Sequence, residues 1–242
     1  MRKSQNLEPP QVWARVAGAL YLLIIATGAF GEIVVRGTLF VPGDPSSTAA
    51  KLAASESLWR IGIAGDILQH VFDIPVMLAL YLILKPVNGN LARLAILFNL
   101  IQTAVLVANS FNLVMPLFLV GNAEYLKAFA PDQLHAWTQL FVRLHTYGFG
   151  IGLVFFGLAC LVYAFLIFKS GYLPRILGVL MMIAGLCYLT NSFALLLAPA
   201  LAAVFVPGIL IPPLIAELSL ALWLVSRGIR VEAWQARAVD LA

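Results

Sequence analysis

The clearest pattern in the sequence is a long apolar segment at residues 58–85, which reads LWRIGIAGDILQHVFDIPVMLALYLILK. Four polar side chains interrupt it: Asp66, Gln69, His70 and Asp73. At helical spacing these positions fall within an arc of about 100° and along about 10 Å of axis, so they share one face. Ionised side chains at membrane depth are costly unless they are paired, so we expect this face to look into a helix bundle or a cavity.

The composition predicts a protein built into a membrane. Hydrophobic residues make up 62% of the 242 residues and charged residues only 11%, whereas about a quarter of a soluble globular domain is charged. The net charge of +4 would suggest a nucleic-acid partner in a soluble protein. Here the basic residues stand at the ends of apolar segments, where they orient helices, so we expect no nucleic-acid partner.

The sequence predicts an all-α fold, a polytopic bundle of six transmembrane helices in a single domain over residues 1–242. Each expected span has the length of about 20 apolar residues that a crossing needs, and residues 228–242 are expected to form a cytoplasmic tail. The first span lacks a cleavage site for a signal peptide, so we expect a retained helix. The expected spans are residues 13–35, 58–84, 91–120, 136–168, 176–197 and 201–225.

Basic residues predict the orientation of the bundle. An even number of spans puts both termini on one side, and most of the basic residues then lie on that side as well. By the positive-inside rule both termini are expected in the cytoplasm. The residues on that side are Arg2, Lys3, Arg15, Lys85, Arg93, Lys169, Arg175, Arg227, Arg230 and Arg237.

The loops expected on the outer side are longer than the inner turns. Residues 46–57, SSTAAKLAASES, are typical of a short helix at the membrane surface with Ser46 or Ser47 as its cap. Residues 121–130 are also expected to form a short helix at the membrane surface. Whether these segments cover an outward-facing cavity or are plain surface loops stays open.

A short internal match hints at a repeat. Asn109-Ser-Phe recurs as Asn191-Ser-Phe, an offset of 191 − 109 = 82 residues. One explanation is a parallel repeat of helix pairs, in which Asn109 and Asn191 would occupy equivalent positions in the outer half of their spans. The other is coincidence in a sequence of biased composition.

Polar residues at membrane depth gather in the outer half of the spans. The sequence therefore predicts a pocket that opens outward and binds a ligand or carries protons, lined by Asp66, Asp73, Arg143, His145 and Glu217. The supporting side chains are expected to be Glu32, Arg36, Arg60, Gln69, His70, Gln102, Asn109, Asn112, Tyr147 and Asn191. Pro75 follows Asp73, and Pro212 and Pro213 precede Glu217, so helix kinks beside these acids are expected, as in transporter sites.

Charge balance leaves two interpretations of this set. Glu32 and Arg36 can pair within one helix. Three acids remain, namely Asp66, Asp73 and Glu217. If Arg60 and Arg143 each pair with one of them, a single carboxylate is left, which must be protonated, paired with histidine or bound to a cation. The alternative to a functional pocket is a network that satisfies itself and fixes the helix register.

A metal site is an alternative use of the same residues. Asp66, His70 and Asp73 on one face, joined by His145 or Glu217, would offer the mixed ligands that zinc or manganese accepts, as in a hydrolase. The spacing lacks an HExxH motif, so these residues are only weak metal candidates and no cofactor is assigned. Cys160 and Cys187 lie in apolar segments and are expected to be packing residues.

Several longer motifs carry a resemblance to a known family: AGALYLL at 17–23, VPGD at 41–44, LKPVN at 84–88, LHTYG at 144–148, GLVFFG at 152–157 and FKSGYLPRILG at 168–178. Over residues 12–228 the chain resembles the bacterial membrane family catalogued as domain of unknown function 4386. The resemblance implies a six-helix protein of the bacterial inner membrane and brings no established activity. It also implies that Asp66, Asp73, His145 and Glu217 occupy positions of the family pattern, whereas His70 and Asn99 do not.

Three functions are compatible with the sequence. The leading hypothesis is binding or transport of a small polar or ionic ligand or of protons, with Arg143 holding a carboxylate or an anionic group. A membrane-embedded enzyme that uses Asp66, Asp73 and His145 is the second. An accessory subunit of a membrane complex is the third. The sequence leaves open whether the protein is an enzyme and what its oligomeric state is.

Overall fold

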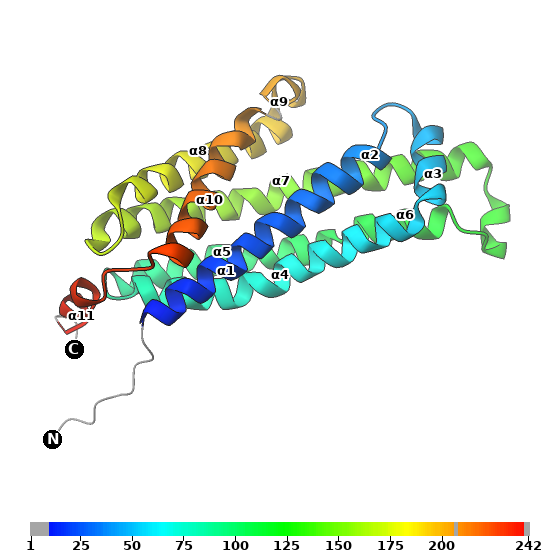
Figure 1. The fold of residues 1–242 in the computed structure, drawn as a ribbon. Coiled ribbons are helices and arrows are strands. Elements are labelled where there is room, and N and C mark those ends of the chain that lie inside the picture. Colours follow the sequence, from blue (N-terminus) through cyan, green and yellow to red (C-terminus); the bar gives the residue numbers. More distant parts are fainter. Residues whose placement is uncertain (1–9, 206–207, 240–242) are drawn as a thin grey trace.

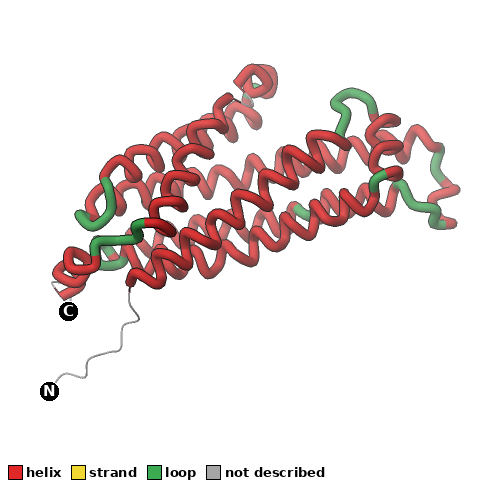
Figure 2. Tube along the Cα trace, in the orientation of Figure 1, coloured by secondary structure: helices red, strands yellow, loops and turns green. Residues whose placement is uncertain are grey.

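The computed structural model describes residues 10–205 and 208–239, and its described residues form helices and short connections without a strand (Figure 2). Six helices are long and apolar enough to cross a membrane, which confirms the predicted all-α bundle. These spans are Pro10–Leu39, Glu56–Leu84, Gly89–Leu119, Pro131–Ser170, Arg175–Leu197 and Gly208–Ser226. Arg2 and Lys3, which entered the orientation argument, lie outside the described residues.

Three of the spans consist of more than one helical segment. The first joins α1 (Pro10–Ala29), the π-helix η1 (Phe30–Arg36) and α2 (Gly37–Leu39), and the third joins α5 (Gly89–Asn109) to α6 (Phe111–Leu119) across Ser110. The others are α4 (Glu56–Leu84), α7 (Pro131–Ser170), α8 (Arg175–Leu197) and α10 (Ile211–Ser226), the last preceded by η3 (Gly208–Leu210). Shorter helices are α3 (Pro45–Ala54), η2 (Glu124–Ala128), α9 (Pro199–Phe205) and α11 (Val231–Val239).

The six spans form a closed ring in chain order. Each span packs against the next, from α1 through α4, α5, α7 and α8 to α10, and α10 returns to α1 (Figure 1). The described chain ends, Pro10 and Val239, lie together at one end of the bundle, here called the terminal end. The opposite end, which carries α3 and η2, is called the loop end.

The helices of the ring differ in length, and this difference creates space at the loop end. Helix α7 has 40 residues and α8 has 23, which correspond to about 60 Å and about 34 Å of axis. Helices α8 and α10 therefore stop part-way along α7, while α1, α4, α6 and α7 continue past the α8–α9–α10 connection (Figure 1).

Buried apolar side chains form two separate clusters. The larger fills the ring toward the terminal end and includes Leu84, Ile167 and Leu224. The smaller lies at the loop end and includes Trp59 and Leu113. Asp66, Gln69 and His70 of α4 and Asn109 of α5 fall between the two clusters, whereas Arg36 and Arg60 lie among the residues of the smaller one.

The terminal end is closed by two hydrogen bonds to one carbonyl. The Tyr172 hydroxyl and the Trp234 indole nitrogen donate to the Ile83 carbonyl over 2.7 and 2.9 Å. The last carbonyls of a helix such as α4 lack partners within it, so these donors satisfy one of them. Residues after 228, expected as a tail, thus include a helix, α11, that docks on the bundle.

The helix at the loop end has a different cap from the one expected. Neither Ser46 nor Ser47 caps α3; the Asp44 carboxylate does, accepting from the Ser47 backbone N–H over 2.9 Å. Pro45 occupies the first helical position, which suits its fixed φ. Hydrogen bonds from Ser47 and Ser46 lower the pKa of Asp44 to about 2.

The sixth span begins later than expected. Residues 199–205 form the separate helix α9, so the span starts at Gly208 rather than at residue 201. Pro212 and Pro213 lie in the first turn of α10. Backbone N–H groups in a first turn have no partner within the helix, so proline loses no helical hydrogen bond there. The two prolines therefore stand at the start of α10 and do not kink it. Helix α4 also continues through Pro75 without a break.

Candidate functional site

An ion-pair cluster joins the first span to α4. The Arg36 Nε atom lies 2.7 Å from Glu32 Oε2, and Arg36 Nη1 lies 2.6 Å from Asp66 Oδ2. Glu32 and Arg36 belong to the π-helix η1, and such wide turns within α-helices are frequent at functional sites.

A glycine makes room for this cluster. A Cβ atom on Gly31 would lie 2.6 Å from Asp66 Oδ1 and 3.0 Å from Arg36 Nη2. These distances are shorter than a van der Waals contact, so the ion pair can approach η1 only because position 31 has no side chain.

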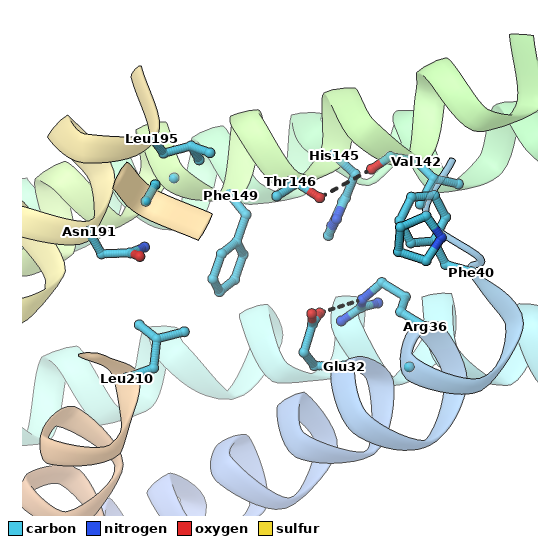
Figure 3. A pocket seen from close by; sticks show the side chains of 14 residues that line it. Glu32, Arg36, Phe40, Val142, His145, Thr146, Phe149, Asn191, Leu195 and Leu210 are labelled. Atoms are coloured by element: carbon cyan, nitrogen blue, oxygen red, sulfur yellow. Dashed lines mark hydrogen bonds and ion pairs between the residues drawn. The ribbon is translucent and has the colours of Figure 1, made fainter. Parts of the chain in front are cut away.

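A half-open cavity of about 440 Å³ lies next to the cluster, between η1–α2 and α7 (Figure 3). The ends of α8 and η3 and helix α9 close one side of it, so the cavity lies where α8 and α10 stop. The His145 ring points across the cavity toward Glu32 and Arg36. Its walls are mainly apolar, with Phe40, Val142, Phe149, Leu195 and Leu210 among the lining residues.

A smaller recess of about 110 Å³ adjoins the cavity and shares Glu32, Arg36, His145 and Phe149 with it. The recess adds polar walls from α4, namely Asp66, Gln69 and His70. At about 30 Å³ per water molecule in the liquid, the recess has room for a few waters or for the polar group of a ligand.

Two buried polar atoms in these walls lack a hydrogen-bond partner among the described residues. They are Oδ1 of Asn191, a residue that lines the cavity, and Nδ1 of His70, a residue that lines the recess. Both side chains are more than nine-tenths buried, with 7% and 6% of their surface exposed. Buried polar atoms without partners are rare and costly, but neither atom is itself exposed to the cavity or the recess.

The position of His145 is fixed by the contact between α5 and α7. Asn109 Nδ2 donates to the His145 backbone carbonyl over 2.9 Å, and Asn112 Nδ2 donates to Asn109 Oδ1 over 2.9 Å. Gly148 faces Asn109, and Gly152 faces Leu106, so both glycines allow α5 to approach α7 closely.

Two acids expected in the pocket lie elsewhere, near the middle of their spans. Asp73 accepts a hydrogen bond from the Thr103 hydroxyl over 3.0 Å, and Glu217 accepts one from Tyr188. Each acid lies about 15 Å along its helix from the terminal end. Both are buried, and neither lines the cavity or the recess. Gln102 is buried beside Thr103.

The prediction of one pocket for five residues therefore needs correction. Asp66 and His145 line the recess together, but Asp73 and Glu217 are separate from it. The Arg143 and Tyr147 side chains are exposed and lie outside the arc of α7 that faces the cavity. Arg60 is also exposed and pairs with Glu56, its Nη2 atom 2.6 Å from Oε1.

The weak metal candidates do not converge. No three or more His, Cys, Asp or Glu side chains in the described part of the chain are placed to hold a metal ion together. Asp73 instead accepts a hydrogen bond from Thr103 on α5.

Several residues of these sites carry no signal in the sequence. Phe40 and Phe149 look like any other aromatic residue of an apolar run. Tyr188 resembles the tyrosines that are common near membrane surfaces. Thr103 could have been found from its place beside Gln102 on the polar face of the third span.

Comparison with known proteins identifies the family. The model of a family described as a domain of unknown function, DUF4386, matches residues 16–228. The chain belongs to this family. The DUF4386 chain is also similar to an uncharacterised protein of Archaeoglobus fulgidus, with 30% identity over 129 residues. That match covers 53% of the DUF4386 chain and 64% of the archaeal protein, less than two thirds of the relative's length. No solved structure matches the DUF4386 chain.

Proposed function

We propose that this DUF4386 protein binds a small amphipathic molecule in the cavity between η1 and α7. The observation that carries the proposal is the pairing of an apolar cavity with an adjoining polar recess, whose walls hold the carboxylates of Glu32 and Asp66. A self-satisfied network that only fixes helix register would need no such space beside it.

The size and lining of the cavity fit a ligand of this kind. Its 440 Å³ falls within the range of about 300–1,000 Å³ that is usual for small-molecule pockets. An apolar body would pack against Phe149, Leu195 and Leu210. The polar group would lie toward His145 and the recess, which Asp66 and His70 line.

The depth of the cavity supports a ligand that concentrates at a membrane surface. His145 lies about 37 Å along α7 from its terminal end, so on a tilted helix it falls near the edge of a hydrocarbon core about 30 Å thick. A molecule with an apolar body and a polar head accumulates at this boundary. It could therefore enter the cavity from the lipid or from water.

The proposed location is the bacterial cytoplasmic membrane, with both termini in the cytoplasm. Basic residues at the terminal end support this orientation by the positive-inside rule, among them Lys85, Arg93, Lys169 and Arg175. In this orientation the cavity faces the outer side. Reporter fusions at the C-terminus that are active only in the cytoplasm or only outside it would test the orientation.

Analysis of co-purified molecules tests the proposed function. Protein extracted gently from its native membrane would be examined by native mass spectrometry. Thr146→Phe would fill the cavity, since Thr146 lines it, whereas Thr190→Phe adds the same side chain at an exposed position outside it. We expect a bound small molecule in the wild type and in Thr190→Phe, with at least about tenfold lower occupancy in Thr146→Phe. Equal occupancy in the two variants, or none in the wild type, would contradict the proposal.

A second candidate, proton movement across the membrane, is favoured by the mid-depth acids. Asp73 and Glu217 have hydroxyl partners, and neither forms an ion pair with a basic side chain in the described residues. Carboxyl groups at membrane depth without a counter-charge are typical of proton relays.

Enzyme activity and an accessory role stay alternatives. Stoichiometric metal in the purified protein would favour the enzyme that the sequence suggested around Asp66, Asp73 and His145. A co-purifying membrane protein that binds the polar face would favour the accessory role.

A further inference from the structure

We infer that the cavity selects an amphipathic amine: a protonated amino group on a compact apolar body. The inference rests on the proposed function and names the class of its ligand. It follows from three features of the walls, namely the sign of their net charge, the carboxylate acceptors that they present and their aromatic lining.

The charge of the cluster is negative, because two carboxylates surround its one cation. Arg36 donates Nε to Glu32 and Nη1 to Asp66, and its Nη2 lies 3.4 Å from the other Asp66 oxygen. Two carboxylates around one guanidinium leave a net charge of one negative when the histidines are neutral. Arg60 and Arg143, the other arginines expected near the site, have exposed side chains and line neither space. An anionic ligand would therefore be repelled, and a cationic one attracted.

The carboxylates of the walls call for hydrogen-bond donors. Glu32 lines both spaces and Asp66 lines the recess, and an ionised carboxylate only accepts hydrogen bonds. A primary ammonium group carries three donors and no acceptor, so it matches these carboxylates.

The aromatic side chains suit a cation with an apolar body. Phe40 and Phe149 line the cavity (Figure 3), and the Phe149 ring stacks on His145 with 6.3 Å between centroids. The faces of aromatic rings attract cations, so these walls favour a positive head group as well as an apolar body.

Three molecules with one shape test the inference. 1-Adamantanamine, 1-adamantanol and 1-adamantanecarboxylate share a rigid apolar cage and are cationic, neutral and anionic at pH 7. Their binding to the full-length protein in nanodiscs of zwitterionic lipid would be measured by equilibrium dialysis, with empty nanodiscs as the correction for partitioning. We expect saturable binding of the amine that is at least about tenfold tighter than that of the carboxylate.

Matched variants connect this selectivity to the cluster. Glu32→Gln removes the net charge and should cut the preference for the amine to less than about threefold. Glu56→Gln is the control. Glu56 pairs with Arg60 four residues later, just as Glu32 pairs with Arg36, but it lines neither the cavity nor the recess. The double variant Glu32→Gln/Asp66→Asn leaves Arg36 as the one charge and should reverse the preference toward the carboxylate. Thermal unfolding of each variant checks that it is folded.

The outcomes separate this inference from the proposed function. Saturable binding without charge preference, or with a preference for the carboxylate, would overturn the amine and leave the cavity as a binding site. Unchanged selectivity in a folded Glu32→Gln variant would also overturn it. If none of the three molecules binds saturably, the amine inference fails, and the co-purification experiment decides the proposed function independently.

Discussion

The guanidinium of Arg36 lies 2.6 Å from the carboxylate of Asp66, and this ion pair connects the π-helical turn of the first span to α4. Arg36 lines both the cavity and the smaller recess, and Asp66 lines the recess. The ion pair therefore holds a residue that the two spaces share, which makes the residues around it the most informative positions for mutation.

Gly31→Ala should destabilise the protein, because the new methyl group would meet the carboxylate at 2.6 Å. We expect a loss of about 1–3 kcal/mol in the free energy of unfolding, as the ion pair must shift. Gly65→Ala on α4 is the control, since a Cβ there meets nothing within 4 Å, and it should leave stability unchanged or raise it by up to about 1 kcal/mol. Chemical unfolding in detergent compares the two variants, and equal effects would argue against the close contact at Gly31.

Tyr172 and Trp234 should show coupling through the carbonyl of Ile83 that both of them bind. Tyr172→Phe and Trp234→Phe each remove one donor and should each cost about 1 kcal/mol of unfolding free energy. The double variant leaves the buried carbonyl without either donor, so we expect an additional loss of about 1–3 kcal/mol beyond the sum. A double-mutant cycle measures this coupling, and strict additivity would contradict the shared acceptor.

Helix α3 should become less stable in acid, because its cap is an ionised carboxylate. The pKa of Asp44 is lowered to about 2 in the folded protein, from about 3.9 for free aspartate. A lowered pKa means that the stabilisation is complete above pH of about 4 and is lost as the pH falls toward 2. Amide hydrogen exchange in α3, corrected for intrinsic rates, should show this loss. Asp44→Asn keeps a capping oxygen but does not titrate, so its protection should not depend on pH in this range.

Asp73→Asn and Glu217→Gln test the proton-coupled candidate. Both substitutions keep the size of the side chain and an acceptor for Thr103 or Tyr188, but remove the group that binds a proton. In proteoliposomes with an imposed pH gradient, we expect each variant to reduce proton uptake to the level of empty liposomes. Glu56→Gln, an exposed acid at the loop end, should retain the wild-type rate. Wild-type flux in both mid-depth variants would rule out their role in proton movement.

The fold could be predicted from the sequence because hydropathy and loop composition determine the number of spans in a membrane. The features that shape the site depend instead on contacts between distant residues. The π-helical turn at Phe30–Arg36 has no pattern of its own in the sequence and is stabilised by the pairing of Arg36 with Asp66. Helix α11 likewise docks through the bond from Trp234 to Ile83, which sequence spacing does not reveal.

The candidate site was predicted only in part, and the reason is geometric. Asp66 and His145 were singled out because ionisable residues at membrane depth are costly, and the structure brings them to one recess. The same rule also selected Arg143, whose side chain is exposed on a face of α7 that is turned away from the cavity, although it is only two residues from His145. Charge alone does not tell which face of a helix a residue occupies in the bundle.

The chemical reactivity of a cysteine at position 146 tests most directly whether an accessible, negatively charged cavity exists. Thr146→Cys, in a background with Cys160 and Cys187 replaced by alanine, would be treated with cationic and anionic methanethiosulfonates of similar size. Ser57→Cys is the control, since it is exposed beside the neutral pair of Glu56 and Arg60. We expect the cysteine at position 146 to react at least about tenfold faster with the cationic reagent, with little difference at position 57 and protection at 146 by 1-adamantanamine. Equal rates with both reagents, or no reaction at position 146, would contradict the central claim.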